Sequence, residues 1–519
     1  MDSFPACWFE SSEPSRAEKL WNASHRKRAL GCKPVSWQTV DAELLSIARN
    51  MIRGSEEQME RNDHLMNLVM FLSPTGQRWT WRDPSSPIGE LWGLDLPVRI
   101  TQQAERAKFD ALFIGSWLVH EGGDIGQQPF TAGYEPFTLM GALAARTDRI
   151  GLIGTASTTF VHPYNMARFM TSLDWLSAGR IGWNVVTSSG GAEHYGVEMP
   201  AHTERYLRAQ EYVSATNALW DAWDDDAVVN DRQSGVWARS SGIHPVDFRG
   251  EHFRVSGQLF MHRSPQGRPV IVQAGQSAAG MEFAARNAEV VFTAQTDLGA
   301  AKEFYRELKE RAAAAGRDPR AIRILPGLMP IVGATTAEAE ALEARLDEYV
   351  DLEVGREQAA ATLQANLDGL DPDEPIPSDR LISPDSVDVE RPFGSRYRNF
   401  YDMAVHQRVP LRRIIANISR TVGHNAATGS AGDIADQLQE WFEAGACDGF
   451  AITPVSMPEG LDGVCQLLVP ELQRRGLART EYDGATLRDH LGLVRPPLPA
   501  RDGAATVSAP TAPVAATTE

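Results

Sequence analysis

An apolar stretch of the chain runs directly into small and polar residues whose types suit ligand binding. It is Pro269-Val-Ile-Val-Gln-Ala-Gly-Gln-Ser277, and it leads into a helical pattern over residues 277–287. The start of a helix offers unpaired backbone N–H groups and a positive dipole end, Gly275 lets the backbone approach closely, and the Ser277 hydroxyl adds a donor. These residues could hold a phosphate. A plain strand-to-helix turn with Ser277 as its N-cap would use the same residues.

Two other polar groups stand near the ends of apolar stretches. Asn184 follows Gly182-Trp, and its carboxamide can both donate and accept, as the O4 and N3 edge or the ribityl chain of a flavin would require. The alternative is that Trp183 packs in the core and Asn184 satisfies a loop. Thr155 begins a hydroxyl series at another strand end, a pattern that ordinary β-strand composition also produces.

His202 and Tyr206 are spaced for a helix. They are four residues apart, so a helix over residues 202–223 would project both side chains from one face, where they could touch one planar ligand. That geometry suits an isoalloxazine ring. A histidine satisfied at the protein surface is the alternative interpretation of His202.

These polar groups need a scaffold that brings strand ends together. Eight short apolar segments are strand candidates: 66–72, 111–115, 150–156, 181–187, 269–274, 289–294, 322–332 and 447–454. Helical patterns lie between most of them, at 97–108, 136–147, 163–177, 202–223, 277–287, 299–315 and 431–446. The alternation predicts an α/β fold, a (β/α)8 TIM barrel with ligand groups at its strand ends.

We expect three parts along the chain. Residues 1–65 are a polar N-terminal extension, 66–495 form the barrel domain, and 496–519 are a disordered tail rich in Ala, Thr and Pro. The domain carries insertions at about 224–268, with one or two extra strands, and at 333–430, as a lid or subdomain. Alternatively, the native protein begins at Met51, Met59 or Met66.

The composition limits the partners. The chain has 519 residues and a formal net charge of −18, which disfavours nucleic acid and anionic membrane surfaces. The four cysteines have no metal-binding spacing, so we expect no metal site and a reducing cytoplasm. No apolar run is long enough to span a membrane, and the N-terminus lacks the order of a secretory signal.

Several stretches in fixed order carry a family resemblance. They are Ala104–Phe113, Ser157–Arg168, Ser172–Ser188, His202–Tyr206, Pro265–Ser277, Asp448–Phe450, Pro470–Tyr482 and Thr486–Gly492. On these stretches the sequence resembles the flavin-dependent monooxygenases of the nitrilotriacetate and dibenzothiophene sulfone type, within the bacterial luciferase-like superfamily. The resemblance covers residues from about 66 to 493.

The resemblance implies a luciferase-like barrel that uses molecular oxygen and reduced FMN, supplied by a separate NAD(P)H-dependent flavin reductase. It implies that Ser277 and Gly275 bind the phosphate and that His202 and Tyr206 contact the phosphate or ribityl region. Thr155 and Asn184 would contact the flavin at neighbouring strand ends. It also makes a homo-oligomer the expected assembly.

The chain departs from the family pattern in two places. Ser116 stands where relatives usually have an aspartate near the flavin, so a hydroxyl that can still donate replaces a carboxylate. Gln77 stands where relatives often have histidine, which alters the substrate side of the pocket. His120 could substitute as a polar group, although an ordinary loop position is the simpler interpretation.

The predicted function is a two-component FMN-dependent monooxygenase acting on a small sulfur- or nitrogen-containing organic molecule, with cleavage of a C–S or C–N bond. The pocket lining should come from the 73–92 loop, the 116–134 loop and the 333–430 region, with Trp79, Trp81 and Trp92 as an apolar wall or as structural packing. The sequence assigns no catalytic side chain. The alternatives are a deazaflavin-dependent oxidoreductase on the same fold and a non-catalytic flavin-binding protein.

Overall fold

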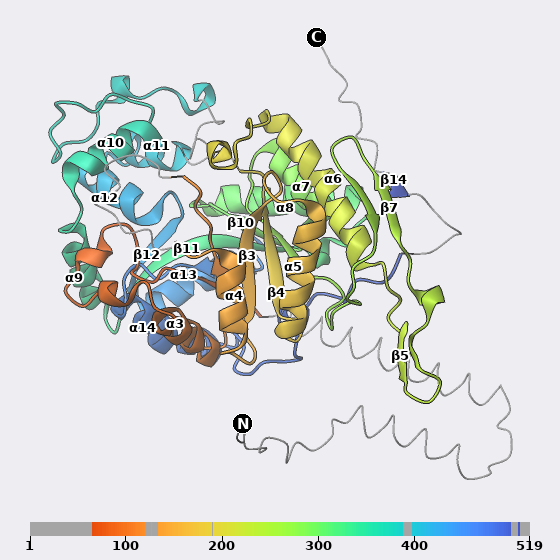
Figure 1. Ribbon diagram of the computed structural model, residues 1–519. Coiled ribbons are helices and arrows are strands. Elements are labelled where there is room, and N and C mark those ends of the chain that lie inside the picture. Colours follow the sequence, from red (N-terminus) through yellow and green to blue (C-terminus); the bar gives the residue numbers. More distant parts are fainter. Residues whose placement is uncertain are drawn as a thin grey trace, which may run out of the picture. The chain divides into compact units, whose positions relative to one another are not determined.

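The computed structural model (Figure 1) describes residues 65–119, 126, 133–188, 190–387 and 397–499, together with a two-residue strand at 507–508. All the described residues belong to one unit of the chain, Met59–Glu519. The predicted N-terminal extension and the alternative start sites lie outside the described residues, except Met66. Most of the predicted disordered tail also lies outside them, so these interpretations stay predictions.

Eight parallel strands close into a barrel, as the sequence predicts. They are β1 (Asn67–Phe71), β2 (Ala111–Ile114), β3 (Gly151–Ser157), β4 (Ile181–Val186), β9 (Val270–Gln273), β10 (Val290–Thr293), β11 (Arg323–Gly333) and β13 (Gly449–Ile452). Each pairs with the next in this order; the β10–β11 and β13–β1 pairings complete the ring. All eight predicted strands are therefore confirmed.

Helices follow the strands where the sequence predicts them. They are α3 (Asp95–Arg106), α4 (Pro136–Ala144), α5 (Pro163–Leu176), α6 (His202–Trp220), α7 (Ala278–Asn287), α8 (Leu298–Ala314) and α13 (Ala431–Glu443). Their starts have local causes: Ser277, Asp297 and Ser430 cap α7, α8 and α13 through side-chain oxygens. In Figure 1, α4 and α5 run beside β3 and β4, on the outside of the barrel.

The barrel interior is filled in layers. One buried cluster takes Val69, Ile153, Val272 and Leu325 from the alternate strands β1, β3, β9 and β11, which is the arrangement of a single TIM-barrel layer. Because side chains alternate along a strand, the residues two positions further on, Phe71, Thr155, Ala274 and Gly327, face the same interior closer to the carboxyl ends of the strands. Thr155 is therefore an inward residue.

A C-terminal segment closes the opposite end of the barrel. Leu487 and Leu491 of α16 (Leu487–Leu491), with Leu493, belong to the interior cluster. Gly151 and Gly182 make room for them, because a Cβ at either position would meet the Leu487 side chain. The N-terminal ends of the strands are thus filled by residues from the far end of the chain.

Two ion pairs anchor this segment. Arg479 lies 2.7 Å from Asp110 with both side chains buried, and Asp110 also accepts the backbone N–H of Leu68 in β1. Arg488 pairs with Glu289 at 2.5 Å. The remaining helices of this region are α14 (Glu459–Asp462), a π-helical stretch at Gly463–Leu468, and α15 (Val469–Arg474).

The first insertion differs from expectation. It contains four strands rather than one or two: the hairpins β5 (Val228–Asp231) with β6 (Val236–Ala238), and β7 (Val246–Arg249) with β8 (Arg254–Gly257). The strand β14 (Val507–Ser508) pairs with β7. Glu211 of α6 holds the β7–β8 turn, because its carboxylate accepts the backbone N–H groups of residues 251–253.

The second insertion has a hydrophobic core of its own. Buried side chains of α10 (Leu352–Thr362), α11 (Tyr397–Val405) and α12 (Leu411–Thr421) form a cluster separate from the barrel clusters. Before it, α9 (Thr336–Asp347) packs against β11. After it, β12 (Asn425–Ser430) pairs with the upper half of β11. The predicted domain boundaries themselves stay predictions.

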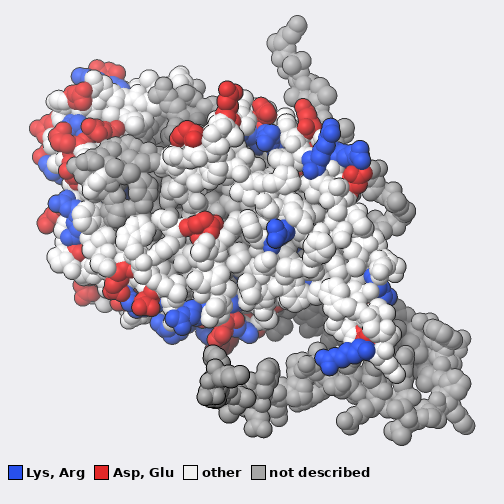
Figure 2. Space-filling model, viewed as in Figure 1, with Lys and Arg blue, Asp and Glu red and all other residues white. Residues whose placement is uncertain are grey.

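The charged surface is mixed. On the face shown in Figure 2, Lys and Arg side chains alternate with Asp and Glu along the edges, and the described basic residues of this face form no continuous stripe. Among the helices that the structure describes, none has both the length and the apolar character needed to cross a membrane.

The buried ion pair predicts a large stability effect. We expect Arg479→Met to lower the free energy of unfolding by about 3–5 kcal/mol, because Asp110 would keep its buried carboxylate without its cation. Urea denaturation measures this. Arg474→Met is the matched control, since Arg474 pairs with Glu471 on the surface and its side chain is 70% exposed. Equal losses in the two variants would contradict the prediction.

The buried Asp174 in α5 predicts that the free energy of unfolding depends on pH. Burial raises the pKa of its carboxyl from 3.8 to about 6. Hydrogen bonds from the Ile181 backbone and the Gln266 amide lower this pKa, but their effect is smaller than that of burial. The folded state therefore holds this proton more tightly than the unfolded chain does. Its stabilising contribution is full below about pH 4 and is lost as the pH rises past 6, on the order of 3 kcal/mol.

Asp174→Asn removes the titrating group and keeps a carbonyl acceptor. The difference in unfolding free energy between the variant and the unchanged protein should therefore shift in favour of the variant between pH 4 and pH 7. Urea unfolding across this range gives the difference directly. A constant difference would show that Asp174 does not titrate there.

Candidate functional site

Two inward side chains at the carboxyl ends of β3 and β4 are joined by a hydrogen bond. Thr155 and Asn184 are register partners, and Asn184 Nδ2 donates to Thr155 Oγ1 at 3.0 Å. Both are buried, at 8% and 3% exposure. Asn184 Oδ1 is also buried and has no hydrogen-bond partner among the described residues. A buried acceptor is thus available to a ligand group that carries an N–H.

An aromatic cluster lies in the barrel interior near this pair. The rings of Phe71 and Phe113 have centroids 4.9 Å apart, and those of Phe113 and Phe292 lie 4.8 Å apart, edge to face. All three face inward from β1, β2 and β10. They give the mouth an apolar wall, against which a flat ring system could pack.

The helices α6 and α7 bring a second group of predicted residues together. The rings of His202 and Tyr206 lie edge to face with centroids 5.2 Å apart, on one face of α6 as the spacing predicts. A Cβ at Gly275 would lie 3.0 Å from the Tyr206 hydroxyl and 2.3 Å from Gln273 Nε2. Gly275 is therefore required by the close approach of these two polar groups.

Ser277 caps α7. Its Oγ accepts the backbone N–H of Gly280 at 3.1 Å, and Gly280 in turn packs against Gly275. The capping interpretation is thereby confirmed. Because Ser277 Oγ is the acceptor in this cap, its hydroxyl proton can still be donated to a ligand. The side chain is exposed beside the first-turn N–H groups of the helix.

The other expected site positions are less closely joined. Ser116 lies half-buried, two residues beyond β2. The backbone N–H of Gln77 donates a hydrogen bond to the carbonyl oxygen of Val455. His120 lies outside the described residues. Trp79 is buried, whereas Trp92 is 67% exposed and its ring contacts Tyr134. The tryptophans of the predicted apolar wall therefore lie in different environments.

The sequence patterns missed one inward polar residue, His424. It follows α12 and directly precedes β12, a strand that was not expected, so no strand end was assigned to it. The sequence did carry one signal for this position. The glycine in Val422-Gly423 favours the end of a helix just before His424.

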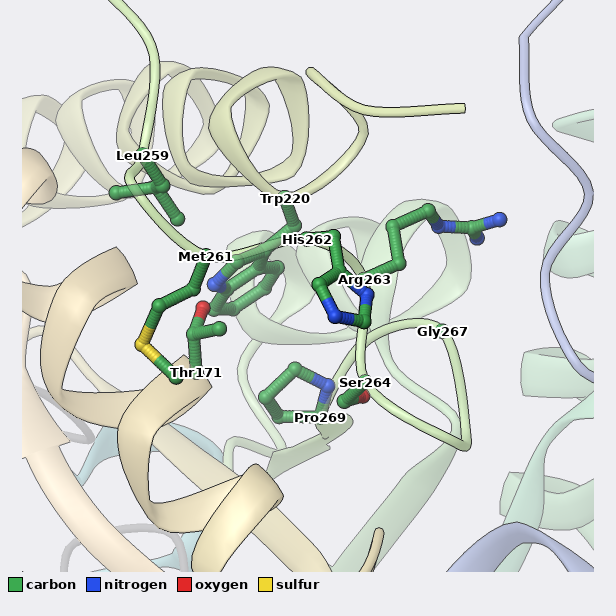
Figure 3. A pocket seen from close by; sticks show the side chains of 9 residues that line it. All are labelled: Thr171, Trp220, Leu259, Met261, His262, Arg263, Ser264, Gly267 and Pro269. Atoms are coloured by element: carbon green, nitrogen blue, oxygen red, sulfur yellow. The ribbon is translucent and has the colours of Figure 1, made fainter. Parts of the chain in front are cut away.

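A small pocket lies away from this mouth. Pro269, just before β9, contributes to it, so it lies towards the amino ends of the strands; Figure 3 shows Trp220, Met261 and His262 around it. Its lining consists of Thr171, Trp220, Leu259, Met261, His262, Arg263, Ser264, Gly267 and Pro269. None of the predicted site residues is among them.

A closed parallel barrel with polar groups gathered at the carboxyl ends of its strands is the architecture of TIM-barrel enzymes. The sequence profile described as luciferase-like monooxygenase matches residues 85–447. The chain belongs to the luciferase-like monooxygenase family, and its expected class, a flavin-dependent monooxygenase, is confirmed.

Similar proteins cover nearly the whole of the barrel domain. The N-acetyl-S-(2-succino)cysteine monooxygenase of Bacillus subtilis (strain 168) is 39% identical over 83% of this chain and 97% of its own. The nitrilotriacetate monooxygenase component A of Aminobacter aminovorans is 39% identical, with the same coverage. The dibenzothiophene-sulfone monooxygenase of Rhodococcus erythropolis (strain XP) is 37% identical over 85% of this chain and 98% of its own.

Solved structures agree with the fold. The EDTA monooxygenase of Chelativorans sp. BNC1 superposes with a TM-score of 0.70 at 29% identity, covering 84% of this chain and all of that one. A riboflavin lyase, solved with modified FMN and riboflavin, has a TM-score of 0.69 at 29% identity, covering 82% of this chain and 96% of that one.

Proposed function

We propose that this protein is the oxygenase component of a two-component FMN-dependent monooxygenase. It would use reduced FMN and O2 to oxygenate a small sulfur- or nitrogen-containing organic molecule, with cleavage of a C–S or C–N bond. The observation that carries the proposal is the buried, unpartnered Asn184 Oδ1 beside an inward aromatic cluster, because it offers an acceptor where a flat N–H-bearing ring could lie.

The phosphate end of the nucleotide fits the start of α7. The Ser277 hydroxyl proton and the first-turn N–H groups of α7 would donate to phosphate oxygens, and the positive end of the helix dipole favours the anion. The Tyr206 hydroxyl stands against Gly275, with His202 beside it on α6. No side chain at position 275 obstructs a close approach.

The ring end fits the barrel mouth. Asn184 Oδ1 would accept a ring N–H, Thr155 would hold the Asn184 amide in this orientation, and the Phe113 and Phe292 rings would exclude water beside the bound ring. Ser116 would contribute a neutral hydroxyl near the ring. When bound, reduced FMN would supply the electrons that activate dioxygen.

The partners follow from the same proposal. A separate NAD(P)H-dependent flavin reductase would supply reduced FMN, in keeping with the name of the nitrilotriacetate monooxygenase component A. The solved riboflavin lyase, which contains modified FMN, supports FMN as the cofactor. We also propose a cytoplasmic location and a homo-oligomeric assembly.

The relatives narrow the class of substrate. One is named for an S-substituted cysteine and another for dibenzothiophene sulfone, both of which contain C–S bonds, whereas nitrilotriacetate contains C–N bonds. Their names support a small organic sulfur or nitrogen compound as the substrate here.

The test is oxygen consumption by the purified protein with FMN reduced by a general flavin reductase. We expect substrate-dependent uptake and an oxygenated product from at least one member of a panel of sulfones, sulfides and aminocarboxylates. Flavin binding without any product would instead favour the non-catalytic binder. Tight binding of a deazaflavin with no binding of FMN would favour the hydride-transferring alternative.

The phosphate assignment is tested by Ser277→Ala, with Ser430→Ala as control. Both residues cap helices through Oγ, so both variants should lose about 1 kcal/mol of stability. Only Ser277→Ala should also weaken FMN binding, by about 1–3 kcal/mol, through loss of a charge-assisted hydrogen bond. Fluorescence titration of FMN measures the difference; equal affinities would remove Ser277 from the site.

A further inference from the structure

His424 lies beside an inward glycine of β11. The parallel pairing of β12 with β11 begins at Leu328 and Asn425, so one residue earlier His424 stands level with Gly327. Gly327 follows the interior residue Leu325 by two positions and therefore faces the barrel interior. Neighbours in register project to the same face of a sheet, so the His424 side chain is directed inward as well.

The contact with Gly327 places the imidazole. A Cβ at Gly327 would lie 2.2 Å from His424 Nδ1 and 2.9 Å from both Cγ and Cε1. The ring thus lies against the β11 backbone, in the space that a β11 side chain would otherwise fill. Any larger residue at position 327 would force the ring to move.

This position faces the Thr155–Asn184 pair across the mouth. In the closed strand order β1-β2-β3-β4-β9-β10-β11-β13, β3 and β11 are four strands apart in either direction. Thr155 and Gly327 also belong to the same layer, because each lies two residues beyond a member of the Val69–Ile153–Val272–Leu325 layer. The imidazole and the polar pair therefore lie on opposite walls of the same space.

The backbone before His424 is held in an unusual conformation. Val422 has φ 49° and Gly423 has φ 82°, and a left-handed conformation is strained for a β-branched residue such as valine. Hydrogen bonds fix the turn: Gly423 N donates to Thr421 Oγ1 at 3.1 Å, and Asn399 Nδ2 donates to Gly423 O at 3.2 Å. Strain of this kind is concentrated at functional sites.

We propose that His424 hydrogen-bonds the flavin ring system from the wall opposite Thr155 and Asn184. The proposal rests on the proposed function and adds to it a contact from the second insertion, which none of the sequence motifs supplied. An imidazole can donate from one nitrogen and accept at the other, so it can serve either kind of ring-edge group. The two walls together would fix the orientation of the ring.

The experiment is FMN titration by fluorescence and absorbance, independent of turnover. We expect His424→Phe, which keeps a flat ring and removes both nitrogens, to raise the Kd for FMN about tenfold, equivalent to 1.4 kcal/mol. His424→Gln should restore most of the affinity, because an amide can still donate and accept. The control is His406→Phe, directly after α11, where the exposed imidazole pairs with Asp402; the Kd of this variant for FMN should stay within twofold of the unchanged protein.

A second variant probes placement without removing a polar group. Gly327→Ala puts a methyl group where the imidazole lies, so it should weaken FMN binding about as much as His424→Phe, and the double variant should show little further loss. The absorbance band of bound FMN should shift in both single variants relative to the unchanged protein.

The outcomes separate the two proposals. FMN affinity unchanged in His424→Phe would show that His424 only packs on Gly327. Equal losses in His424→Phe and His424→Gln would show that the shape of the ring matters and not a hydrogen bond, and would likewise overturn this inference alone. Failure of the unchanged protein to bind FMN would overturn the proposed function along with it.

Discussion

Closure of eight parallel strands into a ring fixes where the inward groups of the candidate site lie, because inward side chains must then share a space of fixed width. The lower layers fill this space with branched residues such as Val69 and Leu325. The rings of Phe113 and Phe292 fill it higher up. At the next level three of the four inward residues, Thr155, Ala274 and Gly327, are small, so the barrel opens at its carboxyl end.

The other end of the barrel is closed by a different device. Glycines in β3 and β4 leave room for Leu487, and the segment that carries it is fixed by the Asp110–Arg479 and Glu289–Arg488 pairs. A buried carboxylate is tolerated only where a cation and backbone donors surround it, so these pairs specify how the chain end docks. A closed base and an open mouth leave one direction from which a ligand can enter.

The polar groups at the mouth form two environments that suit different parts of a ligand. Ser277, Gly275 and Tyr206 stand where a helix start favours an anion, whereas Thr155 and Asn184 stand where burial excludes water. An anionic tail and a flat heteroaromatic ring are the two halves of a flavin mononucleotide, and the two environments suit them separately. The second insertion contributes through β12, which carries His424 to the opposite wall.

The amino-acid sequence by itself determined the barrel. Buried parallel strands read as continuous apolar runs, and their helices carry caps such as Ser277 and Ser430, so strand and helix positions were predictable. The hairpin strands at 228–238 are largely exposed, and β12 reads Asn-Ala-Ala-Thr-Gly-Ser, so neither shows an apolar run. Spacing also predicted the His202–Tyr206 pair, because both lie on one helix.

Only the tertiary structure decided which distant residues meet. The Thr155–Asn184 hydrogen bond depends on the register of β3 with β4, and the contact of His424 with Gly327 depends on β12 taking a place beside β11. Register and strand neighbours join residues that are far apart in the sequence and are set by packing of the closed barrel, so the residues of one strand do not specify its partner.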